Sequence, residues 1–159
     1  MNEPRHSRRV VELKIPSELG YEKVAREAVA TVAKRLGFSD DRIADIKLAV
    51  AEACTNAMTH GSPPDSLTKI VVILTADEQK LEILVKDAGF GSPPTEVTVP
   101  DIHKMVAGEA KLGGMGLYII HELVDKATFI KNHEDGSNSL QMVIYRMDDD
   151  TPSKPASPG

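Results

Sequence analysis

Two neighbouring segments of strand-like residues constrain the fold more than any other feature of this sequence. Residues 69–76 (KIVVILTA) and 80–87 (KLEILVKD) each have the length and the apolar, β-branched content of a strand. In the second segment, Leu81, Ile83 and Val85 fall on one face. Only residues 77–79 (DEQ) separate the two segments. Because the connection is so short, the pair predicts an antiparallel hairpin.

A helix is predicted over residues 18–36, well before the hairpin. Ser17 is a good N-cap for it, and Gly37 supplies the C-terminal stop. Its apolar residues recur every four positions, at Val24, Ala28, Val32 and Leu36. This spacing predicts the side of the helix that packs against the core.

Five further elements follow from periodicity and stop signals. A second helix begins at Ser39 or Asp40 and ends at Gly61; its wide apolar face contains Ile43, Ile46, Leu48, Ala49, Val50, Ala53 and Ala57. A third helix opens at residues 113–116 and closes near Asp125, and strands are expected over residues 11–15, 126–131 and 139–147. This order predicts an α+β two-layer sandwich, with a mixed, mostly antiparallel sheet covered on one face by helices.

The chain is expected to contain one domain with a short segment at each end. Residues 1–8 are polar and expected to be flexible, and residues 9–147 form the domain. Residues 148–159 are acidic and then rich in Pro and Ser, which predicts disorder. Residues 88–112 lack strong periodicity, and a connection of this length is expected to be functional, such as a lid.

Charge and composition exclude several classes of function. The net charge of −5 argues against broad binding to nucleic acid or to an anionic membrane. The longest strongly apolar run, residues 70–74, is too short to span a bilayer, and no signal peptide is visible, so a cytoplasmic location is expected. A single cysteine, Cys54, excludes internal disulfides and a cysteine-based zinc site.

The first chemical motif is 52-EACTNAMTHG-61, in the predicted second helix. Glu52, Asn56 and His60 are four residues apart and therefore share one ridge of the helix. A carboxylate there can accept a proton from an attacking hydroxyl, and an amide oxygen suits Mg²⁺, which takes few protein ligands. The alternative is the solvated face of an amphipathic helix, and His60 is explained by the helix dipole.

The second motif, 87-DAGFG-91, directly follows a predicted strand. The Asp87 carboxylate can accept the exocyclic amine of adenine, which guanine lacks at that position. Gly89 and Gly91 permit close approach of the backbone to a ring. A tight turn would give the same residues, so the alternative stays open.

The third motif, 113-GGMG-116, runs directly into the third helix. Glycines before a helix leave backbone N–H groups at the positive end of the helix dipole, which is suited to phosphate. No GK[ST] follows, so it is not a Walker A loop. The alternative is a flexible hinge at the base of the lid.

Together and in this order, the three motifs resemble those of the GHKL, or Bergerat-fold, ATPases. EACTNAMTHG resembles the N box of that superfamily, DAGFG the G1 box and GGMGLYII the G2 box. The sequence is most similar to the anti-sigma factor serine kinases of the RsbW and SpoIIAB type, over residues 9–147.

This resemblance implies a role for each motif in binding ATP and Mg²⁺. Glu52 would be the general base and Asn56 the Mg²⁺ ligand, while Asp87 would bind the adenine amine. The remaining contacts to the nucleotide would come from two glycine-rich segments: Gly89, Gly91, Gly113, Gly114, Met115, Gly116 and Leu117.

Two positions depart from the family pattern. Some relatives carry an arginine that reaches the terminal phosphate at the position of Leu112. Here either Lys111 replaces it as a point charge, or transfer relies on Mg²⁺ and the helix start alone. The last strand usually begins with Gly-Thr near the phosphates, whereas this chain has Asn138 and Ser139; the hydroxyl of Ser139 is the expected contact.

The resemblance also implies an activity and partners. Such kinases bind a sigma factor to block transcription, in pathways such as the stress response and sporulation. They phosphorylate an anti-anti-sigma protein, a STAS domain, on serine, and they act as homodimers. The first alternative is an anti-sigma module that binds ATP but sequesters its partner without phosphorylation. The second, the ATP-binding part of a histidine kinase, needs an upstream dimerisation domain, and only about 8 residues precede the first expected strand.

Overall fold

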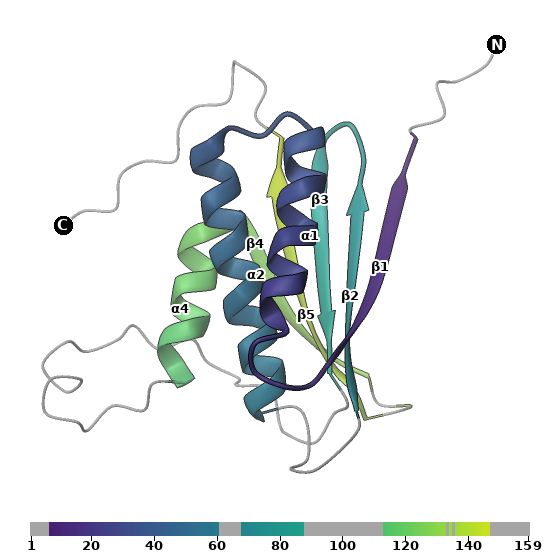
Figure 1. Ribbon diagram of the computed structural model, residues 1–159, viewed down its shortest axis with the longest axis vertical. Helices are drawn as coiled ribbons and strands as arrows, with labels where there is room; N and C mark the ends of the chain where they lie inside the picture. Colours follow the sequence, from purple (N-terminus) through teal and green to yellow (C-terminus); the bar gives the residue numbers. More distant parts are fainter. Residues whose placement is uncertain (1–6, 61–67, 88–112, 133, 135, 147–159) are drawn as a thin grey trace, which may run out of the picture.

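The computed structural model describes residues 7–60, 68–87, 113–132, 134 and 136–146, and these residues form two layers (Figure 1). One layer is an antiparallel sheet in the order β1-β2-β3-β5-β4, and the other is a layer of helices on one of its faces. The elements are β1 (Arg9–Pro16), α1 (Glu22–Arg35), α2 (Asp40–His60), β2 (Lys69–Ala76), β3 (Lys80–Lys86), α4 (Gly113–Leu123), β4 (Lys126–Lys131) and β5 (Asn138–Tyr145). The predicted lid and the acidic tail lie outside the described residues. None of the described helices is long and apolar enough to cross a membrane.

The predicted hairpin is confirmed as β2 and β3. Leu74 pairs with Ile83, and Val72 pairs with Val85. The Asp77 carboxylate closes the turn, because its Oδ1 accepts the backbone N–H groups of Gln79 and Lys80 at 2.7 and 2.9 Å. All the strand pairings among the described residues are antiparallel, so the two-layer α+β fold is confirmed and no parallel pair accompanies it there.

The core lies between the sheet and the helices. Because paired residues share a face of the sheet, one continuous apolar surface meets the helix layer. The strands contribute Ile15, Ile70, Val72, Leu74, Leu81, Ile83, Val85, Leu140, Met142 and Ile144, all of them buried. The low aromatic content of the chain is consistent with this aliphatic and methionine-containing core.

The predicted start of α1 is wrong. The helix begins at Glu22 rather than residue 18, and its N-cap, Tyr21, makes no side-chain capping hydrogen bond. Ser17 is held as a continuation of the strand, because its backbone N–H donates to Thr68 O at 3.2 Å. Gly20 then turns the chain with φ +108°.

The buried side of α1 is also one residue later than predicted. Ala25, Val29 and Ala33 line the core, whereas Val24 is 52% exposed. Val32 and Leu36 pack at the margin of the core. The predicted spacing of four residues is therefore correct, but the residues that face the core lie one position later than predicted.

Helix α2 lies between α1 and α4 and packs against both (Figure 1). Ser39 caps it as predicted, because its Oγ accepts the backbone N–H of Arg42 at 3.2 Å. Most of its predicted apolar face is buried, but Ile43 is only partly buried and Leu48 is 46% exposed. Since α2 has neighbours on two sides, its flank toward α4 can carry polar groups that do not face the sheet.

Candidate functional site

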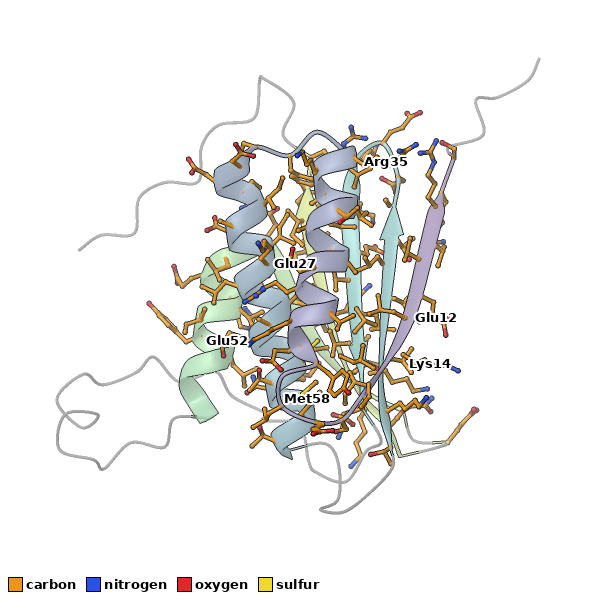
Figure 2. All side chains as sticks on the ribbon, viewed as in Figure 1. Glu12, Lys14, Glu27, Arg35, Glu52 and Met58 are labelled. Atoms are coloured by element: carbon orange, nitrogen blue, oxygen red, sulfur yellow. The ribbon has the colours of Figure 1, made fainter. Side chains whose placement is uncertain are left out.

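Glu52 and Asn56 lie on the flank of α2 that faces α4 (Figure 2 labels Glu52). Both side chains converge on one backbone position of α4, Gly116. A Cβ atom placed at Gly116 would lie 3.1 Å from Glu52 Oε2, and 3.1 and 3.3 Å from Asn56 Nδ2 and Oδ1. The fold thus brings the first and third sequence motifs into direct contact.

The Asn56 amide can make a further hydrogen bond or bind a ligand. Its Nδ2 atom is buried and has no hydrogen-bond partner within the part of the chain that the structure describes. Leaving a buried polar group unpaired typically costs about 1–3 kcal/mol, so an unpaired group calls for an explanation, and a bound ligand or ion is one. The two amide atoms are exchangeable by a flip, so either a donor or an acceptor can be presented there.

The N-terminal turn of α4 supplies backbone donors beside this pair. The helix begins at Gly113 and runs for 11 residues, and its first four N–H groups lack partners within the helix. Gly116, the fourth residue of the helix, lies next to the Glu52 and Asn56 side chains. The positive end of the helix dipole therefore lies next to a carboxylate and an amide.

Asp87 is anchored to the start of β5. Its backbone N–H donates to Asn138 O at 2.9 Å, and its carboxylate Oδ1 accepts the Asn138 N–H at 3.2 Å. This pair fixes the direction of the carboxylate just after β3. The C-terminal end of α2, the end of β3 and the N-terminal end of α4 lie at the same end of the domain (Figure 1).

Asn138 is a buried polar residue at this position that the sequence reasoning did not select. It is 6% exposed and aligns with the core residues Leu140 and Met142 on the helix-covered face. Ser139 pairs with Lys86 and, by strand alternation, faces the opposite side of the sheet. Counting alternate residues back from Leu140 would have indicated that Asn138 faces the helix layer. The contact of Ser139 with a nucleotide stays a prediction.

The other predicted site residues have different surroundings. Leu117 is 3% exposed and belongs to the core. Gly113, Gly114 and Met115 form the first turn of α4. His60 ends α2. The remaining predicted contacts, Gly89, Gly91 and Lys111, lie outside the described residues, as does Leu112.

The single cysteine is not part of the site's chemistry. Cys54 is fully buried in the core, on α2 between Glu52 and Asn56 in the sequence. Burial raises the pKa of the Cys54 thiol to about 12, and the Glu22 carboxylate adds to the shift. The thiol therefore stays protonated and acts as a small apolar group.

Comparison with known proteins finds a matching family model and similar kinases. The model of the family described as "Histidine kinase-like ATPase domain" matches residues 15–144. Serine-protein kinase RsbW of Bacillus cereus (strain B4264) is 36% identical over 134 residues, which cover 82% of this chain and 81% of the relative. RsbW of Bacillus mycoides (strain KBAB4) is 35% identical over 134 residues, with the same coverage.

A solved structure supports the fold. The crystal structure of the RsbU and RsbW domains of a Mycobacterium tuberculosis protein aligns with a TM-score of 0.61 and 19% sequence identity. The alignment covers 87% of this chain and 33% of that one. At this identity, the likeness is one of fold alone.

Proposed function

The chain belongs to the histidine kinase-like ATPase family that includes the RsbW serine-protein kinases, and we propose that its Glu52–Asn56 site transfers the terminal phosphoryl group of ATP to a serine of a partner protein. The observation that carries this proposal is the convergence of the Glu52 carboxylate and the Asn56 amide on Gly116, in the first turns of α4. A carboxylate, an amide and the backbone N–H groups of a helix start are thereby gathered in one place.

The residues present fit Mg²⁺ and nucleotide phosphates. Two features are typical of a site shaped for a ligand. The buried Nδ2 atom of Asn56 is unpaired among the described residues, and a Cβ at position 116 would narrow the space beside Glu52 and Asn56. A phosphate next to the Glu52 carboxylate would be repelled unless a cation lay between them. Asn56 would hold Mg²⁺, which would supply that charge, and binding through few protein groups is typical of Mg²⁺.

The protein's part in the reaction is to position the phosphates and move a proton. The backbone N–H groups at the start of α4 bind the phosphate oxygens. The serine Oγ attacks the γ-phosphorus, and the bond between this phosphorus and the β–γ bridging oxygen breaks, which releases ADP. Glu52 accepts the serine proton as the new P–O bond forms. A positioned general base typically contributes about 10²- to 10⁴-fold in rate.

Asp87 completes the proposed site by binding the base. Its Oδ1 is held by the Asn138 N–H, which fixes the direction in which the carboxylate accepts the adenine amine. Asn138 is buried, and its backbone N–H and carbonyl groups both bond to Asp87, which places it at the same end of the domain. This arrangement favours adenine over guanine, because guanine presents a carbonyl oxygen where adenine presents an amine.

The partners follow from the resemblance to the RsbW kinases. We infer that the chain acts in the cytoplasm as a homodimer, binds a sigma factor of RNA polymerase, and phosphorylates a STAS-domain anti-anti-sigma protein on serine. Phosphorylation would release the STAS protein and leave the sigma factor sequestered. A stress-response or sporulation pathway is the expected setting.

The second candidate is an anti-sigma module that binds ATP without transferring its phosphoryl group to a partner. Leu112 favours it, because some related kinases carry a phosphate-binding arginine at that position. One experiment separates the two: the purified chain is incubated with Mg²⁺, γ-labelled ATP and a STAS-domain protein. The proposal expects labelled phosphoserine, whereas ATP binding without phosphoserine would establish the non-catalytic module.

A further inference from the structure

Gly116 is a glycine in a place where the backbone does not require one. Gly20, Gly37 and Gly136 have positive φ angles, a conformation that favours glycine, but Gly116 lies within helix α4 and is not among them. Glycine is also a poor helix former compared with alanine. Helix formation alone would therefore favour a different residue at position 116.

The surroundings of Gly116 explain the choice. Gly116 is buried, and the atoms nearest to a Cβ there are the side-chain atoms of Glu52 and Asn56, at 3.1–3.3 Å. These distances are shorter than ordinary van der Waals contacts, so the two side chains would have to move by a few tenths of an ångström. No atom lies within 4 Å of the corresponding Cβ position at Gly20, Gly37 or Gly136.

We propose that Gly116 is a positioning residue, whose missing side chain lets the first turns of α4 lie directly against the Glu52 carboxylate and the Asn56 amide. This inference rests on the proposed phosphotransfer. The backbone donors of α4 bind the phosphate that is transferred, and the base on α2 accepts the proton of the serine that attacks it, so the separation of the two must be fixed. Any side chain at position 116 widens that separation or rotates Glu52 and Asn56 away from the phosphate.

The packing can be tested by thermal denaturation, without reference to activity. Gly116→Ala is introduced into the natural chain and into a chain that also carries Glu52→Ala and Asn56→Ala. In the truncated background the contacts are absent, so alanine should raise Tm through its helix propensity. We expect the Tm change in that background to exceed the change in the natural chain by about 3 °C or more. Equal changes in both backgrounds would overturn the proposal.

If the doubly truncated chain does not fold, Asn56→Ala alone provides the background. It removes the contacts at 3.1 and 3.3 Å and keeps only that of Glu52. Gly37→Ala is the matched control, because φ there is +87° and its Cβ meets no atom within 4 Å. It should lower Tm equally in every background and leave the phosphotransfer rate of the folded protein unchanged.

The functional consequence is measured with the kinase assay. Gly116→Ala should slow phosphotransfer by about 10- to 100-fold, since displacements below about 1 Å are costly at a reacting centre. Wild-type phosphotransfer by Gly116→Ala would overturn the positioning role. If the natural chain itself transfers no phosphate, the proposed function fails, and the comparison of Tm changes still decides whether Gly116 sets the contact between α4 and α2.

Discussion

Substituting Asp87 with asparagine separates the proposed binding role of this carboxylate from its structural role. The side chains are nearly the same size, and the asparagine oxygen can still accept the Asn138 N–H that Asp87 Oδ1 accepts at 3.2 Å. The backbone bond from Asp87 N to Asn138 O, at 2.9 Å, does not depend on the side chain. The start of β5 should therefore stay in place.

The expected magnitudes follow from the change of a charged acceptor to a neutral one. A hydrogen bond to a charged group contributes about 1.5–3 kcal/mol, compared with about 0.5–1.5 kcal/mol for a neutral pair. The difference, about 1 kcal/mol, is the expected loss of unfolding free energy. A similar loss at the adenine amine would weaken ATP binding by about 5- to 10-fold. The preference for ATP over GTP should fall as well, because the amide can donate to the guanine oxygen.

The assay is isothermal titration with a non-hydrolysable ATP analogue and with its guanine counterpart. Asp77→Asn is the matched control, because Asp77 Oδ1 also accepts backbone N–H groups, but at the opposite end of β3. The control should lose comparable stability and no nucleotide affinity. If Asp87→Asn binds the ATP analogue as tightly as the natural chain, or if both variants weaken it equally, the adenine-binding role of Asp87 is refuted.

Three further predictions concern the metal, a solvent-accessible hydrogen-bonded carboxylate and pH. Asn56→Ala should abolish the Mg²⁺-dependent part of ATP affinity, measured by titration with Mg²⁺ and with EDTA; an unchanged Mg²⁺ dependence would exclude the metal role. Asp125→Asn should lower the urea unfolding free energy by about 1–2 kcal/mol and leave phosphotransfer intact, because Asp125 Oδ2 accepts Arg42 Nη2 and Tyr145 N, each at 2.7 Å; unchanged stability would show that these bonds contribute nothing. The pKa of Cys54 is raised from 9.0 to about 12, so its contribution to stability is present below pH 9 and is lost as pH rises toward 12. Between pH 8 and about 10.5, the unfolding free energy should decrease less steeply with pH for Cys54→Ala than for the natural chain. Equal slopes would contradict the raised pKa of Cys54.

Local sequence patterns correctly predicted those elements whose limits do not depend on tertiary contacts. Alternation identified the β2–β3 hairpin, and Ser39 identified the start of α2, because both depend on residues close in the sequence. The start of α1 could not be read in this way. The backbone N–H of Ser17 bonds to the carbonyl of Thr68, and no local signal in the sequence shows that Ser17 extends the strand instead of capping the helix.

The candidate site shows the same division between local and tertiary information. The spacing of Glu52 and Asn56 placed both on one ridge of a helix, and the structure keeps them together. Their contact with Gly116 depends on the packing of α4 against α2, which no spacing encodes. Similarly, the position of Asn138 beside Asp87 depends on the register of β3 and β5. Registers and helix contacts of this kind require the assembled fold.

Phosphotransfer by Glu52→Gln tests the central claim most directly. Glutamine keeps the size of Glu52 and its distance to Gly116 but cannot accept the serine proton. In single-turnover reactions with ATP, Mg²⁺ and a STAS-domain substrate, the natural chain should form phosphoserine. The Glu52→Gln variant should do so about 10²- to 10⁴-fold more slowly, with ATP affinity within about threefold. An unchanged phosphotransfer rate in this variant would contradict the assignment of Glu52 as the general base.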